Sequence, residues 1–229
     1  MFRKILVVTS AALSAACQSA PDRREAGGGA TKGVGDDDRP VVLFVGTSLT
    51  AGFGLDETEA YPAWIQRWID SLELGYRVVN AGVSGETSAG GLRRIDWLLD
   101  RPVAVLVVEL GANDALRGLG TRALQRNLEE LVVRARDRHP GVAVVVAGME
   151  APPNLGDDYT EAFRTVFEDV ARANDAVLIP FLLEGVAGDP TLNQADGIHP
   201  TARGQRIIAE TMWRTLRPLL SAGGLDPSS

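Results

Sequence analysis

The sequence predicts an α/β fold in which helices cover both faces of a five-stranded parallel sheet, a three-layer α/β/α sandwich. Two observations lead to this prediction. From Pro40 onward, short apolar runs alternate with amphipathic stretches of helical periodicity, and such alternation builds parallel sheets. The apolar runs also lack a polar face, which is typical of strands that are covered by helices on both sides.

Five short apolar runs, rich in β-branched residues, are the expected strands. The run from Val103 to Leu110 is the most apolar, so we expect it near the centre of the sheet. The five expected strands are Val41–Val45, Tyr76–Asn80, Val103–Leu110, Val142–Gly148 and Ala176–Pro180.

Between these runs, apolar residues recur every three or four positions, as expected for helices that pack one face on a sheet. Thr121 is the expected N-cap of its helix, and Pro200 stands where the last helix is expected to start. The five expected helices are Tyr61–Leu72, Thr87–Leu99, Thr121–Arg138, Asp158–Ala173 and Thr201–Leu219.

The first 17 residues have the pattern of an export signal. Arg3 and Lys4 precede the apolar stretch Ile5–Ala16, which is too short to span a bilayer, and Cys17 follows it. The context of Cys17 resembles a bacterial lipobox, in which the cysteine becomes the lipidated first residue. We therefore expect an exported protein of the periplasm or cell envelope, held to a membrane only by a lipid anchor at Cys17. The alternative is an ordinary signal peptide with an incidental cysteine.

The rest of the 229-residue chain fits one domain. Glycines and the acidic triplet Asp36–Asp38 predict a flexible linker over residues 18–39. The domain is expected over residues 40–220, followed by a short tail at 221–229. The oligomeric state is left open.

The charge and the metal-binding residue types exclude some function classes. The formal net charge is −7, and it becomes −9 when Arg3 and Lys4 are removed with the signal peptide. An acidic surface repels phosphate backbones, so we expect no nucleic-acid partner. Two histidines and one cysteine are a poor supply of zinc ligands, and no phosphate-binding glycine motif is present, so we expect neither a metal nor a cofactor.

Candidate catalytic residues follow the expected strands at their carboxyl ends, where sites of parallel sheets form. Ser48 follows the first strand, and Asp196 and His199 follow the last one. A serine hydroxyl needs a base within hydrogen-bond reach, and that base needs an orienting carboxylate. Ser48, His199 and Asp196 therefore predict a hydrolytic triad. The other histidine, His139, is expected at the opposite edge of the sheet, as a solvated helix end.

Ester hydrolysis also needs hydrogen-bond donors aimed at the developing oxyanion. Three candidates follow the first three strands: the backbone N–H of Ser48, the backbone N–H of Gly82 and the side-chain amide of Asn113. Each glycine or asparagine taken alone is more often a turn or capping residue, so it is their combination that carries the expectation.

Four ordered motifs resemble those of the SGNH or GDSL hydrolases. They are Gly46–Leu49, Gly82, Gly111–Asp114 and Asp196–His199, and the resemblance continues through Thr50–Leu55, Asn80–Thr87 and Gly148–Asn154. The Gly52–Leu55 turn is expected to shape the alcohol side of the substrate pocket. The resemblance covers residues 40–218 and is greatest to the periplasmic multifunctional thioesterase, arylesterase and lysophospholipase branch. It implies a flavodoxin-like sandwich and a serine ester hydrolase that works through an acyl-enzyme.

The resemblance also implies residue roles. Ser48 would be the nucleophile, His199 the base and Asp196 its orienting carboxylate, with Ser48, Gly82 and Asn113 forming the oxyanion hole. One departure is Thr47, where the family usually has aspartate. Threonine keeps a hydroxyl but loses the charge, so the departure concerns how the nucleophile loop is held.

The loops after the third and fourth strands are expected to line the substrate pocket. The expected lining residues are Ala112, Leu116, Met149, Pro152 and Pro153. They suggest a small ester substrate with a medium acyl or an aryl group, and they do not choose between oxygen esters and thioesters. Two alternatives stay open: a carbohydrate O-acetyl esterase on the same scaffold, and a catalytically silent envelope binding lipoprotein.

Overall fold

The structure is a computed structural model that describes residues 38–222. The predicted signal peptide, the candidate lipidation site Cys17 and almost all of the predicted linker lie outside the described residues. In the part that is described, no helix combines the length and the apolar character that a membrane crossing requires.

The five strands form one parallel sheet, as predicted. Their order is β2-β1-β3-β4-β5, so the most apolar strand, β3, lies in the middle. Every residue of β1 is buried, which fits a strand covered on both faces. The strands are β1 (Val41–Gly46), β2 (Arg77–Gly82), β3 (Val103–Glu109), β4 (Ala143–Ala147) and β5 (Val177–Ile179).

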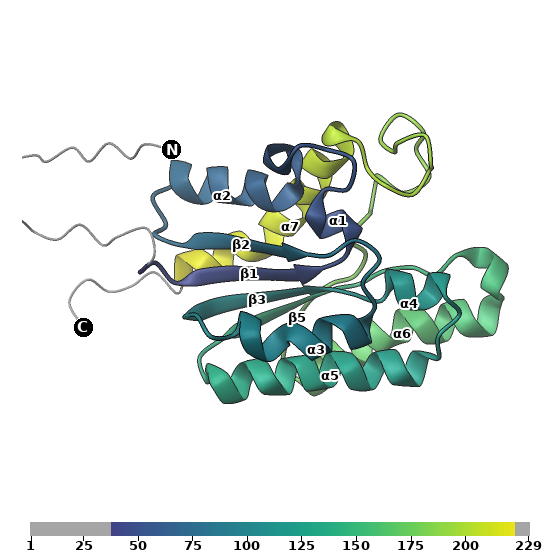
Figure 1. Cartoon of the computed structure of the whole chain (residues 1–229), viewed down its shortest axis with the longest axis horizontal. Helices are drawn as coiled ribbons and strands as arrows, with labels where there is room; N and C mark the ends of the chain where they lie inside the picture. Colours follow the sequence, from purple (N-terminus) through teal and green to yellow (C-terminus); the bar gives the residue numbers. More distant parts are fainter. Residues whose placement is uncertain (1–37, 223–229) are drawn as a thin grey trace, which may run out of the picture. The chain divides into compact units, whose positions relative to one another are not determined.

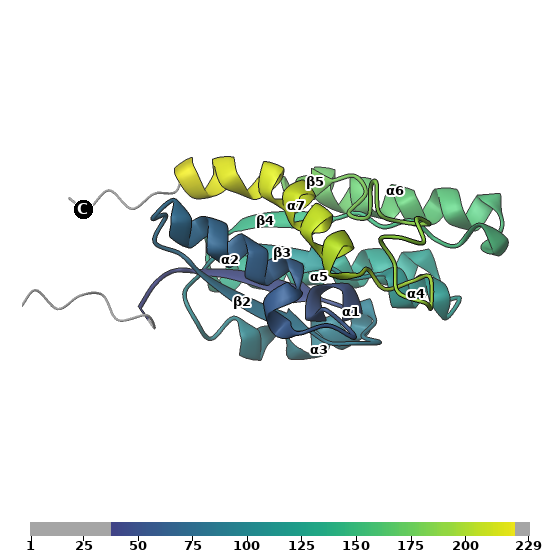
Figure 2. The ribbon, with the colours of Figure 1, turned by 90° about the horizontal axis from the view of Figure 1, so that it is seen from above.

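Helices cover both faces of the sheet and complete the predicted three layers. The helices α2 and α7 pack together on one face, and α3, α5 and α6 lie on the other (Figure 1, Figure 2). The long helices are α2 (Tyr61–Ser71), α3 (Ser88–Leu98), α5 (Thr121–Arg138), α6 (Asp157–Ala173) and α7 (Ala202–Ala222).

Four short elements were not predicted, and all lie in loops. They are the helices α1 (Ser48–Ala51) and α4 (Ala112–Leu116) and the 3₁₀ turns Glu57–Glu59 and Pro153–Leu155. Each has five residues or fewer, so it shows no helical periodicity that a sequence reading could detect. One residue separates α1 from the end of β1, and two residues separate α4 from the end of β3.

Two predicted helix starts need correction. Thr121 is the first residue of α5 rather than its N-cap; that position belongs to Gly120, whose extended backbone marks the boundary. The last helix, expected from Thr201 directly after Pro200, starts one residue later, at Ala202 of α7. Pro200 instead pairs with Asn193 in an isolated antiparallel bridge, so it closes the preceding loop.

The sheet register brings the ends of three strands level with one another. Gly46 at the end of β1 pairs with Gly82 of β2 and with Glu109 of β3. The loops that follow these strands therefore leave the sheet side by side. This edge is where the sequence places its candidate site residues.

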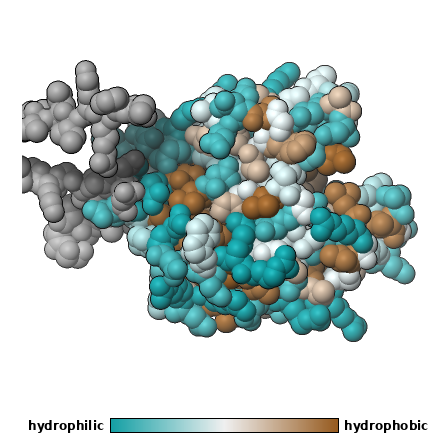
Figure 3. Space-filling model, viewed as in Figure 1, coloured by the Kyte–Doolittle hydropathy of each residue, from teal (hydrophilic) through white to brown (hydrophobic). Residues whose placement is uncertain are grey.

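The hydrophobic core lies between the sheet and both helical layers, and the outer surface is mixed. Figure 3 shows a largely hydrophilic face interrupted by separate hydrophobic patches. In the core, the α6 residue Phe163 is fully buried and its ring packs against those of Tyr159 and Phe167, with centroids 6.2 and 5.2 Å away.

We predict that Phe163→Ala lowers the free energy of unfolding by about 3–5 kcal/mol, because it removes buried contacts and leaves a cavity. Chemical denaturation monitored by circular dichroism measures the change. Leu72→Ala is the control, since Leu72 is 47% exposed and its truncation should have little effect. Equal stability of the two variants would contradict the proposed packing of α6.

Candidate functional site

Ser48 is the first residue of α1, two positions beyond the end of β1. The intervening Thr47 is the N-cap of this short helix, and its hydroxyl accepts a hydrogen bond from Leu49. Gly46 is required by close packing, because a Cβ there would lie 2.0 Å from Oγ1 of Thr50. Gly52 ends the helix in the left-handed conformation that favours glycine.

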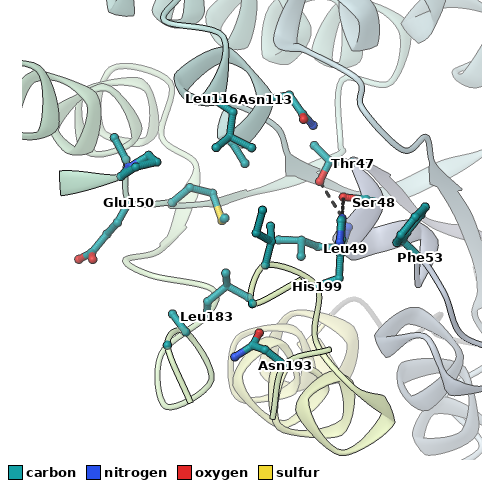
Figure 4. A pocket seen from close by; sticks show the side chains of 18 of the residues that line it. Thr47, Ser48, Leu49, Phe53, Asn113, Leu116, Glu150, Leu183, Asn193 and His199 are labelled. Atoms are coloured by element: carbon teal, nitrogen blue, oxygen red, sulfur yellow. Dashed lines mark hydrogen bonds between the residues drawn. The ribbon is translucent and has the colours of Figure 1, made fainter. Parts of the chain in front are cut away.

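Ser48, His199 and Asp196 form a continuous hydrogen-bonded chain, although the serine and the histidine are 151 residues apart. The Ser48 Oγ lies 3.0 Å from Nε2 of His199, and Nδ1 of His199 lies 2.7 Å from Oδ2 of Asp196 (Figure 4). With Nδ1 bonded to a carboxylate, the proton of a neutral imidazole resides there, and Nε2 is free to accept from the serine.

The loop geometry keeps the Asp196 carboxylate ionised. The backbone N–H of His199 donates to Oδ1 of Asp196 at 3.0 Å, and the N–H of Ile198 donates to the same oxygen at 2.9 Å. These bonds and the contact with the His199 ring lower the pKa of Asp196 to about 2. Asp196 therefore carries its charge at any pH at which the protein is expected to work.

A buried carboxylate, that of Glu109, accepts hydrogen bonds from the loop that carries Ser48. Glu109 ends β3 and is fully buried. It accepts from the backbone N–H of Thr47 at 2.9 Å and from the N–H of Thr50 at 3.3 Å. The hydroxyls of Thr47 and Thr50 also donate to it, at 3.0 and 2.7 Å. Because Thr50 gives its proton to Glu109, it accepts from the Tyr61 hydroxyl, 2.7 Å away.

Burial governs the ionisation of this network. It raises the pKa of Glu109, while the hydrogen bonds from Thr47 and Thr50 act in the opposite direction. The pKa of Tyr61 is raised well above its usual value by burial and by the charge of Glu109, so Tyr61 stays a donor. Four donors on one buried carboxylate are the arrangement that a charge removed from water requires.

Two of the three expected oxyanion donors lie at the Ser48 end of the pocket. The N–H of Ser48 opens α1 and therefore has no acceptor within the helix. Nδ2 of Asn113 donates to the backbone oxygen of Glu86 at 3.0 Å. This bond uses one amide proton and orients the second.

The structure contradicts the expectation that Gly82 is an oxyanion donor. Its N–H donates to Oδ1 of Asn80 at 2.9 Å, and Gly82 does not line the pocket that contains Ser48. A Cβ at Gly82 would lie 2.3 Å from the backbone nitrogen of Ala51, so this glycine allows β2 to pack against α1.

Gly85, three residues after Gly82, does border the pocket, together with Ser48 and Asn113. Its φ of +78° favours glycine. The segment that carries it is fixed by Arg94, whose guanidinium pairs with Glu86 and donates to the backbone oxygen of Ala81 at 2.6 Å.

His139 lies away from this site. It ends α5, and its Nε2 lies 2.9 Å from the backbone oxygen of Leu99, which follows α3. The ring is thus bonded to the protein, rather than simply solvated as the sequence reading suggested. It remains at the edge opposite the carboxyl ends of the strands, so His199 is the histidine that accompanies Ser48.

A cavity of about 550 Å³ opens beside Ser48. All five predicted lining residues, Ala112, Leu116, Met149, Pro152 and Pro153, border it. Figure 4 shows Ser48 and His199 at one end of the pocket and Glu150 at the other. The remaining wall is mostly apolar. Phe53 belongs to it, as expected from the position of the Gly52–Leu55 turn beside the substrate, and Phe181, Leu183 and Ile198 are side chains that the sequence did not assign to the pocket.

Some functional residues were missed, although the sequence contained signals for part of them. Glu109 is a lone acidic residue at the end of the most apolar strand, which is an unusual place for a charge unless it is bonded. Gly85 follows Gly82 by three residues within the same motif, and nothing in the spacing distinguishes the two. Leu183 carries no sequence signal for a pocket.

Within residues 38–222, no group of histidine, cysteine, aspartate and glutamate side chains is arranged to hold a metal ion. The arrangement that does exist is a serine hydroxyl bonded to an imidazole, with N–H donors and an apolar cavity beside it. These are the parts needed for attack on an ester carbonyl.

Comparison with known proteins adds independent findings. The GDSL-like Lipase/Acylhydrolase family matches residues 44–207. Esterase TesA of Pseudomonas aeruginosa is 44% identical over 180 residues, which cover 78% of this chain and 89% of that protein. Thioesterase 1/protease 1/lysophospholipase L1 of Escherichia coli is 36% identical over 184 residues, covering 79% and 85%.

The fold has a solved counterpart in the psychrotrophic esterase EstA from Pseudoalteromonas sp., in a structure inhibited by monoethylphosphonate. The TM-score is 0.75 at 32% identity, and the match covers 79% of this chain and 98% of that chain.

We predict that Thr47→Asp makes stability depend more steeply on pH. The new carboxyl would lie beside Glu109 in a buried site, so the pair would retain a proton and its pKa would rise above that of the unfolded chain. A raised folded-state pKa gives stability that is lost as pH rises, so the variant should lose stability relative to wild type from about pH 5 to about pH 8.

Urea denaturation of both proteins across this pH range measures the difference. Thr47→Ser is the control, because it keeps the hydroxyl that donates to Glu109. Parallel pH profiles for wild type and Thr47→Asp, together with unchanged kinetics, would show that the threonine does not matter to the nucleophile loop.

Proposed function

Because the chain belongs to the GDSL-like lipase/acylhydrolase family, we propose that it is a serine ester hydrolase in which Ser48 forms an acyl-enzyme. The observation that carries this proposal is the hydrogen-bonded chain from Ser48 through His199 to Asp196 at the end of an apolar pocket. That chain supplies a nucleophile, a base and an orienting carboxylate in the geometry that acyl transfer needs.

In the first step, Nε2 of His199 accepts the Ser48 proton while Oγ attacks the ester carbonyl carbon. The tetrahedral oxyanion is stabilised by the N–H groups of Ser48 and Gly85 and by the free amide proton of Asn113. Collapse expels the alcohol or thiol, which takes the proton from His199. Water, giving a proton to His199, then attacks the acyl-enzyme carbonyl, and collapse releases the carboxylic acid and returns the proton to Ser48. Asp196, ionised throughout, stabilises the imidazolium that forms in each half-reaction.

The pocket supports substrates with an acyl chain longer than acetyl. Its walls include Leu116, Met149 and Leu183, and its volume of about 550 Å³ exceeds what two carbons fill. Among the described residues that line it, Glu150 and His199 are the ionisable ones, and no arginine or lysine is present to bind an anionic group. These features support neutral esters and thioesters as substrates, rather than small acetylated sugars. The names of the relatives, esterase and thioesterase, agree with this choice.

We also retain the proposal that the protein is exported and lipid-anchored at Cys17. The support for it is the sequence of residues 1–17, with its positive start, apolar centre and terminal cysteine. An anchor there would tether the domain through the glycine-rich segment that follows.

We predict that Ser48→Ala lowers kcat on p-nitrophenyl butyrate by at least about a thousandfold, because the nucleophile is lost. Asn113→Ala should lower kcat by about 10²–10³ through loss of one oxyanion donor. Ser71→Ala is the matched control, since Ser71 lies on α2 and its hydroxyl donates to the oxygen of Trp68. Undiminished activity in Ser48→Ala would favour the silent binding lipoprotein.

We predict that kcat/KM rises from p-nitrophenyl acetate to the butyrate and remains high for the octanoate. Each methylene buried in an apolar wall contributes up to about 0.8 kcal/mol, or roughly fourfold. Steady-state rates on the three esters at equal pH and salt measure the trend. A rate that is highest for acetate and falls with each longer chain would instead support the O-acetyl esterase.

A further inference from the structure

The loop that carries His199 is held to the rest of the protein by few direct bonds. Within the loop, the N–H of Gln194 donates to the oxygen of His199 at 2.7 Å, and the N–H of Gly197 donates to the oxygen of Gln194 at 2.9 Å. These bonds shape the loop, but they do not fix its distance from Ser48. That distance decides whether the serine can pass its proton to the imidazole.

The side chain of Gln194 bridges the histidine loop to the segment that carries the serine. Its Nε2 donates to the backbone oxygen of Phe53 at 2.7 Å and to that of Pro200 at 3.0 Å. Pro200 directly follows His199, and the N–H of Phe53 donates to the oxygen of Ser48 at 3.0 Å. One amide thus connects the residue after the histidine with a residue bonded to the serine.

The same bridge places an aromatic ring on the imidazole. The rings of Phe53 and His199 have centroids 4.4 Å apart at an angle of 37°. Gly54 leaves room for the bridge, because a Cβ there would lie 2.5 Å from Oε1 of Gln194. The φ of Gly54, +78°, also favours glycine. Both the backbone conformation of this turn and the close approach of Gln194 therefore depend on a glycine at position 54.

A second glutamine, Gln205, connects the neighbouring helices independently of Gln194. Gln205 of α7 is buried, with Nε2 donating to the oxygen of Leu49 at 3.0 Å and Oε1 accepting from the N–H of Tyr61 at 2.9 Å. These bonds fasten α7 to α1 and α2 without Gln194. Removal of the Gln194 amide should therefore loosen the histidine loop while the domain stays folded.

We propose that Gln194 is a positioning residue that sets the distance between His199 and Ser48, an inference that rests on the proposed roles of these two residues. Both of its N–H donors are used, one on each segment, so the function needs a side chain of this length with two donors. Its contribution lies in the rate of the chemical step rather than in substrate binding.

Gln194→Met tests the proposal, because it keeps the length and volume but removes both donors. We expect kcat on p-nitrophenyl butyrate to fall by about 10- to 100-fold, the effect of a misplacement near 1 Å, with KM within about twofold of wild type. The rate at which a fluorophosphonate labels Ser48 should fall in parallel. Gln194→Ala, which leaves no bulk to distort the loop, should give the same losses.

Gln66→Met is the matched control. The Gln66 amide also bridges two segments, donating to Asp70 at 2.8 Å and accepting from the N–H of Val78 at 2.6 Å, but these segments are α2 and β2 rather than the histidine loop and the segment after Ser48. It should leave kcat and the labelling rate near those of wild type, whatever its effect on the unfolding temperature.

Wild-type kcat and labelling rate in Gln194→Met would overturn the inference and leave the proposed function intact. A fall of the same size in Gln66→Met would also overturn it, since the loss would then come from general destabilisation. A wild-type protein that no fluorophosphonate labels, on the other hand, would overturn the proposed function and this inference with it.

Discussion

The candidate site depends on one buried charge, that of Glu109. A carboxylate taken out of water is strongly destabilising unless hydrogen bonds replace its hydration, and here two threonines provide both their N–H and their hydroxyl groups. The hydrogen bonds to Glu109 hold Thr47 and Thr50 in fixed positions on either side of Ser48 and Leu49. Ser48, the proposed nucleophile, is thus positioned by a carboxylate that does not itself line the pocket.

This arrangement also explains how the chain tolerates threonine at position 47. The Thr47 hydroxyl caps the N-terminus of α1 and also donates a hydrogen bond to Glu109. Glu109 then remains the sole carboxylate of the network and has a full set of donors. The departure from the family pattern is therefore compatible with an intact nucleophile loop.

The fold class and the central strand of the sheet could be predicted from the sequence, because both follow from the periodicity of apolar residues. The grouping of Ser48, His199 and Asp196 could also be predicted, because all three follow strands that end at the same edge of the sheet. Prediction from the sequence failed for residues whose role depends on contacts in the folded structure rather than on a local sequence pattern. Gly82 and Gly85 are three residues apart, and only their surroundings in the fold show that the first packs against α1 and the second borders the pocket. The bridge made by Gln194 joins segments 141 residues apart, so no local pattern could reveal it.

The strand order has a consequence for the oxyanion hole. Its three proposed donors follow β1, β2 and β3, which are adjacent in the sheet and end level with one another. Neighbouring strands are held about 4.8 Å apart by their own backbone hydrogen bonds. The spacing of the strands therefore sets the spacing of the three proposed donors, and with it the width of the oxyanion hole. The loops beyond the donors can vary in sequence and change the shape of the pocket without changing this spacing.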